Sequence, residues 1–230
     1  CKAFFFFFLG AIWHDLLPQA KANFYEWHHR EHMPERVGIP GFLRGRRYIA
    51  VHGTPEYFNL YEALSPEVLS GQDYMQRLNS PTPWTREVVA SFRGVARSIC
   101  RVLYSGGVGQ GAVMVTVRFA VESSAETEVT RLLRQEALPR ACDMAGIVGA
   151  HLCRADEAGS RVETAEKKAR NDATEVPSWI LLVEAISVDA AEACVLQVIT
   201  QLRECNGVHG IDQATYRLEY QRCKLPWGES

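Results

Sequence analysis

The sequence predicts an α+β protein made of two ferredoxin-like βαββαβ repeats that pack sheet against sheet. The first observation is that the chain resembles itself, since residues 31–34 fall on residues 136–139 at an offset of 105 positions. The second is that further matches follow in order, so that residues 62–65 fall on residues 184–187 at an offset of 122. The third is that each half has the pattern βαββαβ, whose sheet has helices on one face and needs a partner on the other.

The length and charge of the chain fit two small domains. A glycine-rich segment at residues 104–111 separates the halves of the 230-residue chain, so we expect domains at 1–104 and 112–230. The first is expected to carry the histidine site, and the second to be structural. A net charge of −2 gives no general attraction to nucleic acids or membranes, and we expect neither as a partner.

The cysteines and the first residues bear on location. Seven cysteines lie far apart and form no C-x-x-C pair. This indicates free thiols in a reducing cytoplasm, rather than disulfides or structural zinc. The apolar run that begins at Phe4 is far shorter than the ~20 residues of a spanning helix, so we expect a buried strand there and no membrane anchor. Because the chain starts at Cys1, we expect further residues before it.

The elements of the first half follow from apolar patterns and turn residues. Strands are predicted over residues 4–12, 42–51, 57–63 and 92–103. Pro18 opens a helix at its first turn, and this helix is expected to reach about His32 and to end before Pro34. A serine N-cap followed by proline predicts a second helix over 66–78, and residues 79–90 are expected to be irregular.

The second half repeats this order. Strands are predicted over residues 112–121, 147–154, 179–186 and 211–220. Helices are predicted over residues 125–138 and 190–202. The main departure is a charged insertion at residues 155–177, which we expect to be a surface loop with a helical turn; a lid over a pocket is the alternative.

The first predicted helix places polar side chains on its buried face. On a helical wheel, His28 and Glu31 lie on the apolar stripe that faces the sheet, and His32 lies at its edge. A buried polar group without a partner costs ~1–3 kcal/mol, so these groups need partners or a function. The second repeat has Leu133 and Ala137 at the positions of the two histidines, which shows that the scaffold does not require imidazoles. We therefore expect the chemistry in the first repeat, and a structural role for Glu31, whose counterpart is also a glutamate.

A motif around this helix resembles a known family. The chain contains an F-x7-H-x-P segment that runs from Phe24 through His32 to Pro34. The pair Pro40-Gly41 follows it at the start of the next strand. The segment resembles the EthD-like branch of the dimeric α/β-barrel superfamily over about residues 12–50, whereas the resemblance elsewhere is topological. The chain departs from that branch in the position of Trp27 and in its additional histidines at positions 28 and 29.

The resemblance implies a barrel of two ferredoxin-like units, with a pocket between a sheet and its helices. Relatives with this fold include muconolactone isomerases, cofactor-free monooxygenases, polyketide cyclases, dehydratases and some haem proteins. Because these reactions differ, the fold predicts a pocket better than it predicts one reaction.

Candidate site residues lie on this helix and on the neighbouring strands. We expect general acid or base catalysis by His28 and His32, with His14, at the end of the first strand, as a third candidate. Alternation places three polar side chains of the third strand on one face, where they could line a site or meet the partner sheet. Arg44 and Arg46 share a face and could hold a carboxylate, or could simply be solvated or paired. The expected substrate-binding residues are Trp27, Tyr57, Asn59, Tyr61, Arg44 and Arg46.

The sequence gives little support for a metal or a cofactor. His28 and His32 are four residues apart and could reach one ion, with Glu31 or Glu35 nearby, yet no H-E-x-x-H motif is present. A haem iron could take an axial imidazole, but no haem-attachment motif is present. The candidate axial ligands are His28, His32, His151 and His209. Nucleotide-binding and nucleophile-elbow motifs are absent as well, so we expect no metal and no cofactor.

These observations predict a cofactor-independent enzyme that uses histidine acid/base chemistry on a small carboxylated, cyclic or aromatic metabolite, as a lyase, dehydratase or isomerase. One alternative is a non-catalytic ligand-binding protein, and another is a haem- or metal-dependent monooxygenase of the same fold. We expect the halves to close on each other within one chain, because the eight-residue linker spans up to ~25–29 Å and packed sheets lie ~10 Å apart. We also expect a cytoplasmic homodimer that forms through outer surfaces.

Overall fold

Strands of both halves form one closed barrel in the part of the chain that the computed structural model describes, residues 8–170 and 172–224. Their order is β1-β3-β2-β8-β5-β7-β6-β4, and β4 pairs back to β1. All pairings between these strands are antiparallel. The strands are β1 (Phe8–Leu16), β2 (Phe42–His52), β3 (Tyr57–Ala63), β4 (Phe92–Gly107), β5 (Val113–Val121), β6 (Ile147–Ala155), β7 (Trp179–Ala185) and β8 (Val208–Cys223).

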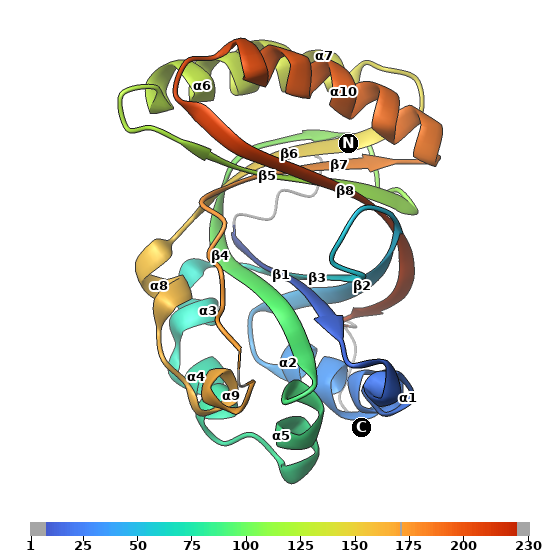
Figure 1. Cartoon of the computed structure of the whole chain (residues 1–230), viewed down its shortest axis with the longest axis vertical. Helices are drawn as coiled ribbons and strands as arrows, with labels where there is room; N and C mark the ends of the chain where they lie inside the picture. Colours follow the sequence, from blue (N-terminus) through green and yellow to red (C-terminus); the bar gives the residue numbers. More distant parts are fainter. Residues whose placement is uncertain (1–7, 171, 225–230) are drawn as a thin grey trace.

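Each half contributes one ferredoxin-like sheet to this barrel. The first half has the order β4-β1-β3-β2, and the second half has the equivalent order β8-β5-β7-β6. The halves join where β2 pairs with β8 and where β4 pairs with β6. Figure 1 shows α1–α5 (residues 21–89) of the first half and α6, α7 and α10 (residues 126–142 and 188–204) of the second half on opposite outer sides, with the sheets between them. The predicted fold class is therefore confirmed, since two βαββαβ repeats form a dimeric α/β barrel within one chain.

Short helices cover the outside of the barrel. The α-helices are α1 (Lys21–Trp27), α2 (Met33–Gly38), α3 (Pro66–Ser70), α4 (Gln72–Asn79), α5 (Pro83–Val89), α6 (Glu126–Leu132), α7 (Leu138–Cys142), α8 (Glu157–Arg161), α9 (Ala165–Ala169) and α10 (Val188–Glu204). A 3₁₀ turn, η1 (Pro18–Ala20), precedes α1. Two π-helical segments, η2 (His28–His32) and η3 (Leu133–Ala137), connect α1 to α2 and α6 to α7.

The π-helical segments occur at the same position of the two repeats. The backbone N–H of Met33 donates to the carbonyl of His28, and the N–H of Leu138 donates to that of Leu133, which are i to i−5 bonds. A proline follows each of these residues in the sequence. The prediction that the first helix ends before Pro34 is therefore wrong, because the wider turn accommodates a residue without an N–H and α2 continues to Gly38.

Other boundaries differ from the prediction for local reasons. The segment 79–90 contains α5, which starts at a proline and is capped by the side chain of Thr82. The single helix expected over 66–78 is broken at Gly71 into α3 and α4. Strand β4 continues through Gly107 into the expected linker, because this part of it pairs with β6 and closes the barrel. Residues 4–7 of the first expected strand lie outside the described residues.

The insertion of the second repeat packs against the first repeat. It contains α8 and α9, and Figure 1 shows both helices beside α3, α4 and α5. Ser160, Thr164, Glu166 and Arg170 of this segment are buried. The sequence predicts a surface loop with a helical turn here; the insertion contains two short helices, and Glu166 is buried in an ion pair with Arg36 of the first repeat and another with Arg170 of the insertion.

The barrel interior is packed with side chains from both sheets. Its apolar part includes Leu9, Trp13, Tyr48, Phe58, Met114, Leu182 and Tyr216. Nearer one end, Arg46 donates to Glu62 Oε1 at 2.7 Å and to Glu184 Oε2 at 3.0 Å. These two glutamates are equivalent in the repeat, and His151 is the equivalent of Arg46. A buried arginine of one repeat therefore links matching carboxylates of both repeats.

The described cysteines are free thiols, as expected; Cys1 lies outside the described residues. Burial raises the pKa of the Cys153 thiol, and the same effect acts on Cys100. In the described part of the chain, no helix has the length and apolar character needed to cross a membrane.

Candidate active site

A small cavity lies between the sheet of the first repeat and the helices that cover it. The hollow measures about 290 Å³ together with the solvent at its opening, but the centres of water molecules can occupy only about 20 Å³. A ligand larger than one or two waters must therefore displace part of the wall. The predicted site residues that line the cavity are Trp27, His28, His32, Asn59 and Tyr61.

The remaining walls divide into an apolar and a charged part. Ile12, Val89 and Phe92 provide apolar surface from β1, α5 and β4. Glu166 and Arg170 come from the insertion of the second repeat. The insertion therefore covers the cavity, which is the arrangement of the lid alternative rather than that of a distant loop.

His28 is buried and is held from both sides of its ring. Arg47 Nη1 lies 3.2 Å from His28 Nδ1, and the Tyr61 hydroxyl lies 3.5 Å from Nε2. A guanidinium can only donate, so Nδ1 is the acceptor and the ring proton lies on Nε2, directed at Tyr61. Burial lowers the pKa of His28 well below 6.5, and the neighbouring His32 imidazole and the positive charge of Arg47 disfavour its protonation further. His28 is thus a neutral ring that connects a cation to the Tyr61 hydroxyl.

His32 is buried beside His28, with ring centroids 5.4 Å apart, and it packs on Trp27 at 4.3 Å. Its Nδ1 is buried and has no hydrogen-bond partner among the described residues. Burial, followed by the charges of Arg36 and Arg170, holds the pKa of His32 well below 6.5. A neutral imidazole with an unused ring nitrogen at a cavity has the properties of a general base.

His14 and Tyr57 lie behind the cavity. Asn59 Nδ2 donates to His14 Nε2 at 3.0 Å, and His14 Nδ1 lies 3.3 Å from the Asp15 carbonyl. Both ring nitrogens are thereby engaged, and burial lowers the pKa of His14 to about 3. Asn59 Oδ1 is left without a partner in the described structure. The geometry therefore favours His14 as a residue that orients Asn59, while the Tyr57 hydroxyl faces another tyrosine.

The structure does not bring Arg44 and Arg46 to the cavity. Arg44 Nε donates to Glu62 Oε1 at 2.7 Å, and Arg46 is paired inside the barrel as described above. Both guanidiniums lie on the barrel side of the sheet, whereas the cavity lies on its helix side. The residues of β2 that face the helices are those that alternate with Arg44 and Arg46. Alternation in the sequence showed that the two arginines share a face, but it did not show that this face is the barrel interior.

The arginine that does reach the histidines is Arg47, which is not among the predicted site residues. It donates to His28, lies 2.8 Å from His29 Nε2, and pairs with Glu219 of β8 at 2.7 Å. The alternation of side chains along a strand could have indicated this residue, because Arg47 lies on the opposite face of β2 from Arg46.

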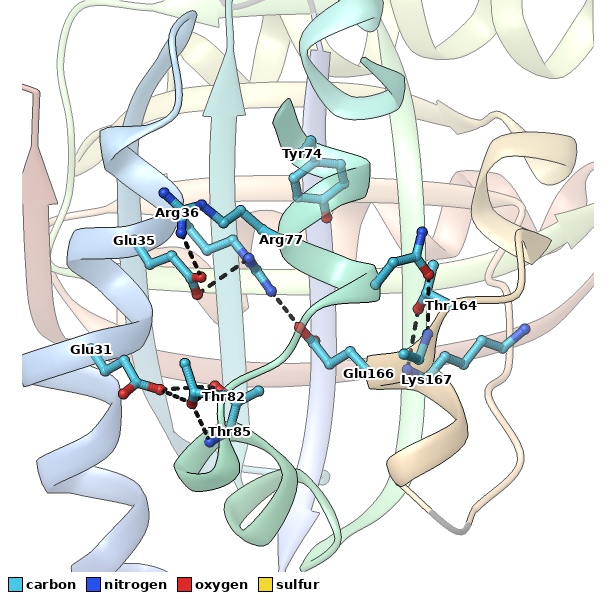
Figure 2. A network of polar contacts seen from close by, with 12 residues as sticks. Glu31, Glu35, Arg36, Tyr74, Arg77, Thr82, Thr85, Thr164, Glu166 and Lys167 are labelled. Carbon is cyan, nitrogen blue, oxygen red and sulfur yellow. Dashed lines mark hydrogen bonds and ion pairs between the residues drawn. The ribbon is translucent and has the colours of Figure 1, made fainter. Parts of the chain in front are cut away.

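A polar network links the histidine helix to its cover (Figure 2). Thr82 and Thr85 donate to Glu31 Oε1 at 2.5 and 2.9 Å, and Arg36 pairs with Glu166 of the insertion. Glu31 therefore binds the start of α5 and does not face the sheet as the helical wheel suggested. The wheel assumes 3.6 residues per turn, and the π-helical segment departs from that spacing.

The residues at the cavity do not fit a metal ion or a haem. Among the described residues, no group of three or more His, Cys, Asp or Glu side chains is arranged to hold a metal. Both ring nitrogens of His28 are engaged, and Arg47 and Arg170 would repel a cation. His151 lies at the barrel interior and His209 is exposed, and the cavity beside His32 is far too small for a porphyrin.

Three buried neutral histidines predict that acid destabilises the fold. The pKa values of His14, His28 and His32 are lowered, so the unfolded chain takes up protons below pH 6.5 that the folded chain does not. The stability that the fold gains from these neutral imidazoles is complete above pH 6.5, and it is lost as the pH falls towards their lowered pKa values. We expect the free energy of unfolding in urea to fall by about 4 kcal/mol from pH 7.5 to 5.5. His32→Leu should remove about a third of this dependence, and an unchanged slope would contradict it; the exposed His209→Gln is the control.

Comparisons with known proteins identify the fold. No family model matches the chain, and no curated protein is similar to it in sequence. An anthrone oxidase-like protein of known structure superposes with a TM-score of 0.67 at 12% identity, covering 95% of this chain and 93% of the other. A candidate monooxygenase from Fusobacterium nucleatum gives 0.63 at 10% identity, covering 96% of both chains. A candidate chlorite dismutase gives 0.55 at 11% identity, covering 94% and 95%. At these identities the likenesses show the fold alone, which is that of a dimeric α/β barrel.

Proposed function

We propose that the chain is an enzyme that transfers a proton on a small cyclic or aromatic metabolite bound in this cavity, with His32 as the base. The observation that carries the proposal is a buried, neutral His32 whose Nδ1 has no partner, next to a Tyr61 hydroxyl that His28 and Arg47 support. A neutral imidazole accepts a proton, and an oriented hydroxyl stabilises the oxyanion that develops.

The proposed step removes a proton from a carbon beside a carbonyl group. His32 takes the proton, and the electron pair moves onto the carbonyl oxygen, which accepts a hydrogen bond from Tyr61. Burial raises the pKa of Tyr61, so its hydroxyl keeps its proton and remains a donor. Protonated His32 then returns the proton to another carbon, which is an isomerisation, or to a departing hydroxide, which is a dehydration.

A cofactor-free oxygenation is the second candidate. It begins with the same proton removal, after which molecular oxygen reacts with the electron-rich carbon. Similar structures bear the names of a monooxygenase and of an anthrone oxidase-like protein, which supports this candidate at the level of the fold. Placement in the EthD-like branch, a cytoplasmic location and homodimer formation remain predictions.

Proton exchange in D₂O tests the proposal without knowledge of the natural substrate. The probes are simple cyclic ketones and hydroxy-substituted cyclic ketones, and proton NMR measures the loss of their C–H signals. We expect the protein to accelerate exchange at least ~10-fold over buffer. The rate should stay level from pH 7.5 to about 5.5, because the lowered pKa keeps His32 neutral there.

The contrary outcomes separate the alternatives. If a probe binds, as measured by calorimetry, and no probe exchanges at any pH, the protein is a ligand-binding protein and the proposal is wrong. Oxygen uptake in air, with exchange alone under argon, would identify the oxygenation.

A further inference from the structure

Arg170, at the end of α9, is a buried cation with unused hydrogen-bond donors. It is 4% exposed, and its Nη2 donates to Glu166 Oε1 at 2.9 Å. Its Nε and Nη1 are buried and have no hydrogen-bond partner among the described residues. An arginine side chain can only donate, and it remains charged in proteins, so these N–H groups require an acceptor.

The charges around Arg170 leave a positive excess. Arg36 and Arg170 share the carboxylate of Glu166, and both guanidiniums are buried. Arg36 has a second acidic neighbour in Glu35, whereas Glu166 is the sole ion-pair partner of Arg170 in the described structure. Arg97 adds a further positive charge beside Arg170, and its guanidinium binds a tyrosine hydroxyl rather than a carboxylate. Burying an incompletely paired charge is costly, so an anion from outside would be stabilised here.

This positive excess lies at the cavity that His28 and His32 line. Arg170 lines the same cavity as His32, Trp27 and Phe92. We propose that Arg170 binds the anionic group, a carboxylate or an equivalent oxyanion, of a ligand whose ring lies beside the edge-to-face pair of Trp27 and Phe92 once part of the cavity wall has moved. The second repeat thereby supplies a specificity-determining residue to the site of the first repeat. This inference deepens the proposed function, because it assigns a negative charge to the substrate.

The anion would also act on the base. Arg170 is one of the charges that lower the pKa of His32. A carboxylate on Arg170 compensates that charge, so binding of an acidic substrate raises the pKa of His32 towards the pH at which it works.

Calorimetry with benzoate and benzamide tests the charge requirement directly. The two probes have the same ring and similar shape, and they differ in charge. We expect the full chain to bind benzoate at least ~10-fold more tightly than benzamide, as for a charge-assisted hydrogen bond. Arg170→Gln should remove this preference, and the control Arg161→Gln, an exposed arginine of the same insertion, should keep it.

Two results would overturn the inference: equal binding of both probes by the unmodified chain, or an unchanged preference in Arg170→Gln. If Arg170→Gln does not fold, Glu166→Gln decides, since removal of the competing carboxylate should strengthen benzoate binding several-fold and leave benzamide unchanged. No change in either probe would then refute it. If the protein prefers benzoate but catalyses no proton exchange, Arg170 is the anion-binding residue and the proposed reaction is wrong. If it catalyses exchange but shows no preference for benzoate, the proposed reaction stands and the role of Arg170 is wrong.

Discussion

His32→Ala is expected to lower kcat/KM for a carbon acid that exchanges in the cavity by ~10²–10⁴-fold, the usual contribution of a positioned general base. The second repeat already carries alanine at the equivalent position, in a π-helical segment of the same kind. His32 Nδ1 also has no hydrogen-bond partner to lose in the described structure. Catalysis should therefore fall while the fold remains, and initial rates together with urea unfolding measure the two effects separately.

The controls for this prediction come from the same chain. His28→Leu is the other substitution present in the second repeat, and it removes the imidazole between Arg47 and Tyr61. We expect it to lower kcat, while His32 remains as the base. His209→Ala changes an exposed imidazole and should leave the rate as it is. A His32→Ala variant that retains full turnover would show that another group takes the proton, and the assignment would fail.

The contrast between the repeats made this part of the site predictable from sequence. His28 and His32 lie on a helix with one buried face, and the second repeat has no imidazole at either position. This contrast indicated that the two histidines are not needed by the scaffold. Alternation on β3 added Asn59 and Tyr61, which the structure places at the same cavity. These signals selected residues that line one cavity because they depend on the spacing of neighbouring residues, and the catalytic and binding roles of these residues stay predictions.

The residues that escaped prediction depend on contacts between distant segments. Arg170 and Glu166 reach the cavity from an insertion more than a hundred positions away, and a charged composition is usual for solvated loops. Alternation separates the two faces of β2, but only closure of the barrel decides which face is interior, so the sequence predicts Arg46 at the site where the structure places Arg47. The helix was ended too early because a π-helical turn has no simple sequence signature, and proline normally stops an α-helix.

Arg46→Met is expected to destabilise the fold by ~3–5 kcal/mol, because it leaves buried carboxylates without their main counter-charge. Glu62 retains Arg44 at 2.7 Å, whereas Glu184 retains the backbone N–H of Gly111 at 3.2 Å and His151 at 3.6 Å. Urea unfolding measures the loss. Arg131→Met is the matched control, since it breaks an ion-pair cluster on the surface and should cost far less than the loss of Arg46.

The pH dependence of this loss distinguishes a charge effect from a packing effect. Burial would raise the pKa of Glu184, but His151 and Arg46 outweigh it and lower the value to about 2. In the unmodified chain, the stability from this carboxylate is present above pH ~4.5 and is lost as the pH falls through about 2. Without Arg46, the carboxylate should protonate at higher pH and relieve its own burial penalty. The difference in unfolding free energy should therefore shrink between pH 7 and pH 4. A constant difference would mean that lost packing, not the buried charges that join the two repeats, dominates.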